Sequence, residues 1–344
     1  MKCRPDDFSS GHRHAARSRC RTRSFTLLEI LVAAALTLAL AGLLLGIATG
    51  ALDLMHRSQG NLTANAAAKS ILDLVERDLQ SAIVRPDGGV WLAVDVVSDP
   101  AVLVNHGWLT TSTRAKPTGS ESAQLLGDPA NPDLTVARFG LSGAWVRWVT
   151  TNVETAGSLP IVVSYQIVRR PVTGAVNPAN PAGARYQLYR AAVSADQTLV
   201  SGTALTVAAY QSASSQPGAT RAPASVTNPA SEDALASNVA DFGIWLYVRA
   251  ADGRLQRIFP ADAADRSHAA QGGTSAPSTA RYPDVADVMV RLLSEEGAAL
   301  LENMETGRGP RPPQYATDDA WWWAIVTGHS QVFVRRIFVG MPPS

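Results

Sequence analysis

The chain has 344 residues, of which 17% are charged and 46% hydrophobic, and its formal net charge is +1. The basic excess lies at the start: residues 1–24 hold seven basic and two acidic residues, a net of +5, so the remainder carries −4. Because nucleic-acid binding needs a basic surface, the mildly acidic body argues against a nucleic-acid partner.

Both cysteines, Cys3 and Cys20, lie in this basic segment. If the segment is removed, the remaining chain has no thiol for a disulfide or a metal site. A zinc site made of Cys3, His12, His14 and Cys20 is the alternative. Its spacing fits no standard zinc pattern, and its Arg- and Ser-rich surroundings are typical of disorder. We therefore expect neither a metal nor a cofactor.

An uncharged apolar run extends from Ile30 to Leu52. As a helix its 23 residues span about 35 Å, enough to cross a hydrocarbon core of about 30 Å. The arginines before the run predict a cytoplasmic N-terminus and a C-terminal body outside the cytoplasm, which in a diderm bacterium is the periplasm. A secretory signal peptide and a plain single-pass anchor are alternatives. The run is long for a signal peptide, and neither alternative accounts for the carboxylate of Glu29.

The residues around this carboxylate carry a resemblance to a known family. The run Ser-Phe-Thr-Leu-Leu-Glu-Ile at residues 24–30, between arginines and an apolar helix, resembles the signal of type IV prepilins and type II secretion pseudopilins. The resemblance implies that a prepilin peptidase cuts between Ser24 and Phe25 and then N-methylates Phe25. It also implies that Glu29 pairs with the N-terminal ammonium of a neighbouring subunit. Ser24 departs from the family, which prefers glycine before the cut.

Glycines recur every four residues within the apolar run, at Gly42, Gly46 and Gly50. This spacing predicts a small-residue face on which neighbouring helices pack closely. Since glycine also weakens helices, a segment that melts during assembly is a second interpretation. The ordinary glycine frequency of membrane helices is a third.

Residues 54–85 are predicted to continue the helix, with Pro86 as its stop. An amphipathic stripe of Leu72, Val75, Leu79 and Ile83 predicts packing under a globular head. The acidic and basic residues between these positions, including an Asp73/Arg77 pair, indicate either a solvated face or a charged interaction surface. A bend is expected at Gly60-Asn61.

The head, residues 86–344, is predicted to be β-rich because several segments alternate with a period of two and no βαβ rhythm occurs. The predicted fold class is therefore α+β, a long N-terminal helix packed on an antiparallel head with long loops. The predicted strands are 90–97, 134–139, 144–149, 161–169, 185–193, 242–249, 255–259, 285–293 and 331–339. Segments rich in Pro, Ser, Ala and Asn, predicted to be partly disordered surface insertions, are 177–183, 212–232, 261–281 and 307–313.

The head also resembles the same family. The helix segment 71–80 is similar to that of the J-type minor pseudopilin and the W-type minor pilin. The runs at 164–165 and 188–190, and those at 239–242 and 282–288, resemble the central and C-terminal strands of these proteins. The overall layout, with the terminal run 334–340, is similar to Verru_Chthon cassette protein C.

Candidate catalytic residues are sparse. His329 and Ser330 with Asp318 or Asp319 are the components of a hydrolytic triad, but the run around Ser330 lacks the second glycine of a nucleophile elbow. Adjacent strand residues also face opposite sides. Glu295-Glu296 are expected on a solvated turn. The remaining histidines are dispersed, and no phosphate-binding, dinucleotide-binding or EF-hand spacing occurs.

Three consecutive tryptophans, Trp321 to Trp323, are expected on a strand. At least one indole would then face away from the core and favour a partner, although burial under the loop 308–313 is the commoner outcome. We expect a non-enzymatic filament subunit held in the inner membrane. Its expected partners are the prepilin peptidase, other pilin or pseudopilin subunits and an inner-membrane assembly platform. A membrane-anchored binding module and an anchored hydrolase that uses Ser330 are the alternatives.

Overall fold

The computed structural model describes residues 26–100, 102–103, 115–118, 122–151, 159–172, 183–193, 205, 226–273 and 277–339. The chain divides into two units, Met1–Arg57 and Ser58–Ser344. The described part combines helices with antiparallel sheets, so the predicted α+β class is confirmed. Most of the predicted insertions at 177–183 and 212–232 lie outside the described residues.

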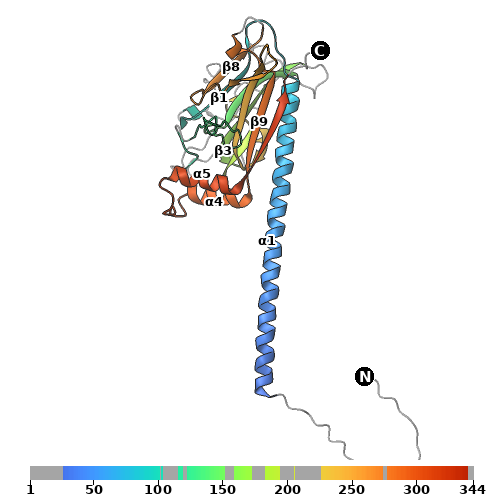
Figure 1. Ribbon diagram of the computed structural model, residues 1–344, viewed down its shortest axis with the longest axis vertical. Coiled ribbons are helices and arrows are strands. Elements are labelled where there is room, and N and C mark those ends of the chain that lie inside the picture. The colour runs from blue at the N-terminus through green and yellow to red at the C-terminus, as the bar shows by residue number, and fades with distance from the viewer. Residues whose placement is uncertain are drawn as a thin grey trace, which may run out of the picture. The chain divides into compact units, whose positions relative to one another are not determined.

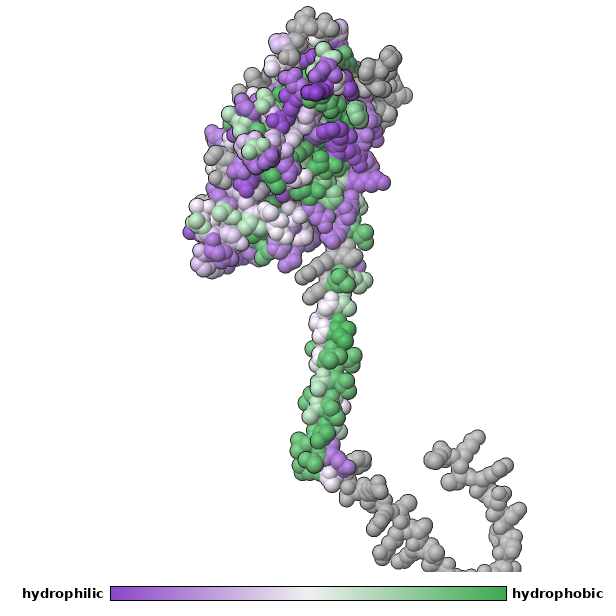
Figure 2. All heavy atoms as spheres, in the orientation of Figure 1, coloured by the Kyte–Doolittle hydropathy of each residue, from purple (hydrophilic) through white to green (hydrophobic). Residues whose placement is uncertain are grey.

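The first unit holds the N-terminal part of helix α1, which extends from Leu27 to Gln80 (Figure 1). Every residue from 26 to 52 is exposed, and hydrophobic side chains follow this part of the helix (Figure 2). Within the described residues, Leu27–Leu52 is the one helical segment long and apolar enough to cross a membrane. This agrees with a single-pass membrane segment.

The second unit begins with the remainder of α1, whose buried stripe packs against the sheets. Leu72, Val75 and Leu79 are buried as the periodicity predicts. The helix is continuous through Gly60-Asn61, so no break in helical structure occurs at the expected bend. It ends at Gln80, five residues before the predicted end. Ile83 N–H donates to the carbonyl of Val149 at 2.9 Å, which draws the chain into extended pairing before Pro86.

A six-stranded antiparallel sheet has the order β5-β4-β3-β2-β1-β8. Its strands are β1 (Val90–Val96), β2 (Ala144–Thr151), β3 (Pro160–Pro171), β4 (Ala184–Val193), β5 (Ala234–Ser237) and β8 (Ser267–Gln271). The sequence predicted β1 to β4 but not the short edge strands β5 and β8. Strand β8 lies within 261–281, which was wrongly predicted to be an insertion.

A four-stranded antiparallel sheet has the order β10-β9-β6-β7. Its strands are β6 (Val239–Arg249), β7 (Leu255–Phe259), β9 (Val285–Leu293) and β10 (Ser330–Phe338). Asn238 joins β5 to β6 with a φ of 62°, a left-handed conformation that asparagine tolerates better than most residues. The two sheets therefore meet where one chain segment leaves the first sheet and enters the second.

Two helices, α4 (Glu295–Glu305) and α5 (Asp318–His329), connect β9 to β10. The sequence interpretation missed both. Ser294 and Thr317 cap them, their hydroxyls accepting from the N–H groups of Gly297 and Ala320. Glu295 and Glu296 form the first turn of α4, where carboxylates favour the helix dipole, and not an isolated turn. The predicted strand at 134–139 is also wrong, since these residues form turns and irregular structure.

The main core lies between α1 and one face of the two sheets. Trp148 and Tyr165 from the six-stranded sheet stack with ring centroids 5.1 Å apart, and Tyr165 stacks on Phe242 of β6 at 6.1 Å. Residues of both sheets and of α1 belong to this one hydrophobic cluster. Stacked aromatic pairs stabilise beyond their buried area, by about 0.5–1.5 kcal/mol each, so this row ties the two sheets together.

Candidate functional site

The N-terminal end of α1 is closed by a reciprocal contact between Thr26 and Glu29. The Thr26 hydroxyl accepts from the N–H of Glu29 at 3.3 Å, and Glu29 Oε2 accepts from the N–H of Thr26 at 3.0 Å. The Thr26 hydroxyl also donates to Oε2 at 3.2 Å. This is a capping box, in which each side chain satisfies a backbone N–H that the helix leaves unpaired.

The capping box gives the carboxylate at the front of the apolar helix an intrachain partner. The helix dipole favours negative charge at this end. Glu29 is the only ionisable residue between positions 26 and 52. The sequence interpretation assigned Glu29 from the family resemblance and missed the capping role, although the Thr-x-x-Glu spacing at 26–29 is its sequence signal. Ser24 and Phe25, the predicted cleavage residues, lie outside the described residues.

Gly42, Gly46 and Gly50 lie on α1 at a spacing that places them along one side of the helix. A Cβ atom added at any of the three would meet no described atom within 4 Å. In this chain, therefore, the described structure does not require glycine at these positions. Open space beside small residues allows another helix to approach closely.

The two threonines within the apolar segment direct their hydroxyls at the helix itself. Thr37 donates to the carbonyls of Ala33 and Ala34 at 3.0 and 2.9 Å, and Thr49 donates to the carbonyl of Leu45 at 3.0 Å. Such bonds satisfy the hydroxyl without water. The segment is therefore suited to an apolar surrounding over its length, apart from the capped end.

In the head, Asp78 of α1 binds two residues of the six-stranded sheet. Its carboxylate accepts from Arg190 Nε at 2.7 Å and from the Tyr165 hydroxyl at 2.6 Å. Burial and the adjacent Asp78 carboxylate hold the pKa of Tyr165 well above its usual value. Earlier in the same helix, Asp73 and Glu76 both bind Arg335 of β10, with Arg335 Nη1 at 2.5 and 2.9 Å from their carboxylate oxygens. The acidic side of α1 is thus bound by residues of both sheets. The predicted Asp73/Arg77 pairing stays a prediction.

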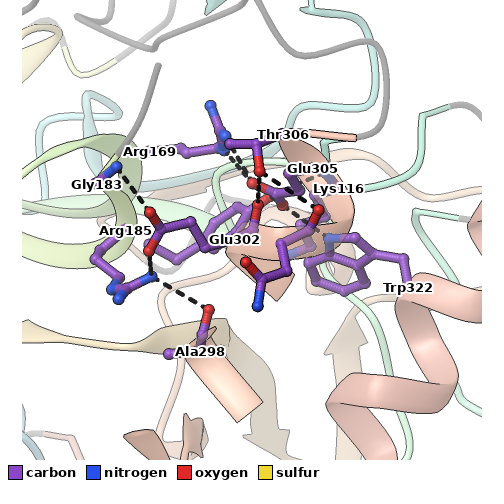
Figure 3. Close-up of polar contacts among 11 residues, drawn as sticks. Lys116, Arg169, Gly183, Arg185, Ala298, Glu302, Glu305, Thr306 and Trp322 are labelled. Carbon is purple, nitrogen blue, oxygen red and sulfur yellow. Dashed lines mark hydrogen bonds and ion pairs between the residues drawn. The ribbon is translucent and has the colours of Figure 1, made fainter. Parts of the chain in front are cut away.

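A buried polar group in the head, the Glu305 cluster, consists of Glu305 with Arg169, Tyr186 and Trp322. Figure 3 shows Glu305 with Arg169 and Trp322. Glu305 receives hydrogen bonds from Arg169 Nε at 2.8 Å, the Tyr186 hydroxyl at 2.5 Å and the Trp322 indole N–H at 3.1 Å. Burial together with the Glu305 carboxylate raises the pKa of Tyr186 well above its usual value. Since each of these donors already has its acceptor, the cluster holds α4 and α5 on β3 and β4 and leaves little room for a ligand.

The cavities beside these groups are small or open. One of about 10 Å³, next to Glu305 and Asn238, has about the volume that one water molecule needs. An open hollow of about 400 Å³ lies beside Asp262, Asp265 and His268. Among the described residues, no three His, Cys, Asp or Glu side chains are placed to hold a metal ion.

The hydrolytic triad considered from the sequence does not form. Asp318 and His329 are the first and last residues of α5, which places them about 16 Å apart along the helix axis. Helix α5 also carries the three tryptophans that were expected on a strand. Trp322 and Trp323 are buried and Trp321 is partly buried, so helical geometry directs two consecutive indoles into the core.

Comparison of the chain with protein-family models, with curated proteins and with solved structures finds no match. Function must therefore be inferred from the residues of the chain itself. Among the features described, the capped carboxylate at the front of an exposed apolar helix is the one that a soluble head would not need.

Proposed function

We propose that the chain is a minor pilin or pseudopilin, a structural and assembly subunit of a type IV pilus or a type II secretion-like filament. The observation that carries this proposal is the Thr26–Glu29 capping box at the front of a 26-residue apolar segment. The apolar helix has a polar, capped end and an exposed surface. This combination is suited to a segment that lies in lipid before assembly and among other helices afterwards.

Processing precedes assembly in this proposal. The basic leader 1–24 keeps the junction in the cytoplasm, and a prepilin peptidase cuts between Ser24 and Phe25. N-methylation of Phe25 follows. The subunit then lies in the inner membrane as a single-pass protein, with its C-terminal head on the periplasmic side.

Glu29 has two successive partners in this scheme. Before assembly its carboxylate accepts from the N–H of Thr26, which lowers the cost of keeping a charge at the membrane boundary. In the filament it pairs with the N-terminal ammonium of a neighbouring subunit. The amide N–H is a neutral dipole whereas the ammonium carries a full positive charge, so exchanging one for the other adds a charge–charge attraction that favours the assembled state.

The glycine positions complete the assembly surface. Gly42, Gly46 and Gly50 carry no side chains on one side of α1, and no described atom lies within 4 Å of a Cβ added at any of them. Neighbouring subunits would pack their helices along this side. Inner-membrane assembly proteins and other pilin subunits are the partners that this proposal requires.

The deciding experiment is mass spectrometry of the mature N-terminus. We expect N-methylated phenylalanine at position 25; an uncut leader at steady state would contradict the proposal and favour a membrane-anchored binding module. A second experiment compares Glu29→Gln and Glu29→Ala with the wild type in filament fractions. We expect both variants to insert into the membrane and to be depleted from filaments. Incorporation of Glu29→Gln at the wild-type level would exclude the charge-pairing role.

A further inference from the structure

Lys116 and Asp241 form an ion pair from which solvent is excluded. Lys116 Nζ lies 3.3 Å from Asp241 Oδ1, and neither side chain has any exposed surface. Nζ also donates to the backbone carbonyl of Ala240 at 2.9 Å. The two residues are 125 positions apart in the sequence. Neither residue has a part in the function proposed above.

Backbone groups fix the orientation of the Asp241 carboxylate. Oδ2 accepts from the N–H of Phe139 at 3.1 Å, and Oδ1 accepts from the N–H of Phe242 at 3.0 Å. The amine therefore meets the carboxyl group at Oδ1, while Oδ2 is held on a backbone donor. A donor at this position also stabilises the negative charge that builds on an oxygen when a nucleophile attacks the carboxyl carbon.

The surroundings favour the neutral, nucleophilic form of the lysine. Burial lowers the pKa of the Lys116 ammonium, and the nearby Arg291 and Arg138 lower it further, against the opposing effect of Asp241. Burying two full charges costs free energy that a neutral group in the same place would not cost. Both effects act in the same direction, toward loss of the ion pair.

We propose that Lys116 and Asp241 condense to an intramolecular amide that links the segment 115–118 to strand β6. One proton passes from the ammonium to Oδ1, which gives a neutral amine and a carboxylic acid. Nζ then attacks the carboxyl carbon, the C–N bond forms, and the bond from that carbon to Oδ1 breaks. Oδ1 leaves as water with the proton that it received and a second proton from Nζ, while Oδ2 remains as the amide carbonyl on the Phe139 N–H. Atoms and charge balance, and no co-reactant is needed.

Two features of the site favour the condensed product. The reacting groups are held in contact, which raises their effective concentration far above that of free reactants. Bulk water, which would hydrolyse the amide, has no access to the fully buried pair. Residues 25–344 contain no cysteine, so this bond would supply a covalent cross-link in a body that cannot form a disulfide.

The test is the intact mass of the purified full chain, together with peptide mapping. We expect the wild type to be lighter than its sequence by one water molecule, and a branched peptide that contains both Lys116 and Asp241. Lys116→Arg retains the positive charge but removes the reactive amine, and should restore the sequence mass. Lys69→Arg, at an exposed lysine of α1, is the matched control and should leave the mass deficit unchanged.

The wild-type measurement decides the matter even if Lys116→Arg fails to fold. A wild-type mass equal to that of the sequence, with linear peptides that carry unmodified Lys116 and Asp241, would overturn the inference. A mass deficit that persists in Lys116→Arg would also overturn it, because the lost water would then come from another site.

Discussion

Asp78 on α1 and Arg190 on β4 form a two-point contact, with Nε and Nη2 of the arginine 2.7 and 3.1 Å from the two carboxylate oxygens. The same carboxylate accepts from the buried hydroxyl of Tyr165. The charged face of this helix was predicted to be either solvated or an interaction surface. One of its acids instead holds the six-stranded sheet of the same chain.

Replacing Asp78 by alanine should destabilise the head. Removing one partner of a buried ion pair costs about 3–5 kcal/mol, and partial exposure of the Arg190 side chain reduces this to about 2–3 kcal/mol. Denaturant unfolding of the detergent-solubilised chain measures the change. Asp252→Ala is the control: its pair with Arg254 is exposed and 3.7 Å long, and its carboxylate also accepts from the exposed Arg254 N–H at 3.0 Å, so a loss of about 1 kcal/mol or less is expected. Equal stability of both variants would contradict the structural role of Asp78.

Glu305 and Glu302 offer a matched comparison on one helix. Glu305→Gln removes the charge that faces Arg169 in a site with almost no exposure, and should cost about 3 kcal/mol. Glu302→Gln weakens a partly exposed contact with Arg185 and should cost about 1 kcal/mol or less. Because the Trp322 indole donates to Glu305, only Glu305→Gln should change the tryptophan fluorescence of the folded chain. A similar loss of stability in both variants would contradict a larger contribution of the buried Glu305 cluster to the stability of the head.

Features that depend on neighbouring residues of the sequence could be predicted, whereas contacts between distant residues could not. The stripe of Leu72, Val75 and Leu79 was predictable because helical periodicity alone places these residues on one side. The contact of Asp73 with Arg335 was not, because it joins residues 262 positions apart and depends on where β10 lies in the sheet. Strands β2, β3 and β9 were found because their central residues alternate or are continuously apolar between turn signals.

Helix α5 was missed for a different reason. Three tryptophans followed by Ile325 and Val326 have high strand propensity, and tertiary packing overrides that propensity here. The cap at Thr317 and the acidic first turn at Asp318 and Asp319 were readable helix signals. The capping box at residues 26–29 was equally readable. In predicting secondary structure, a helix-capping pattern next to an apolar run is therefore stronger evidence than strand propensity.

Replacing glycine by alanine should have opposite effects on stability at Gly243 and at Gly328. A Cβ at Gly243 would lie 2.2 Å from the ring of Phe139, so Gly243→Ala should overpack the core and cost about 1–3 kcal/mol. A Cβ at Gly328, within α5, meets no described atom within 4 Å, so Gly328→Ala should stabilise by about 0.5–1 kcal/mol through helix propensity. Thermal unfolding of the two variants beside the wild type measures both. If Gly243→Ala were as stable as the wild type, this result would contradict the close packing of the Phe139 ring on Gly243 of β6.

His268 predicts how the stability of the head depends on pH. Burial lowers the pKa of its imidazole, against the opposing effect of Asp265, and its Nε2 has no hydrogen-bond partner among the described residues. The unfolded chain therefore binds the proton more readily than the folded chain. Stability then rises with pH between the lowered folded pKa and the unfolded value of about 6.5, and falls as the pH drops through this window.

His268→Gln should flatten this part of the stability curve, because glutamine does not titrate. The measurement is the free energy of unfolding of the wild type and the variant between pH 5 and 7.5 at constant ionic strength, taking about 6.5 as the unfolded reference. Loss of packing on Phe259, whose ring centroid is 5.9 Å from that of His268, lowers the variant's stability at every pH. The titration of His268 is therefore read from the slope of stability against pH and not from the absolute stability. A wild-type curve that rises toward acid pH in this range would reverse the sign of the argument and place the imidazole in a site that favours its charged form.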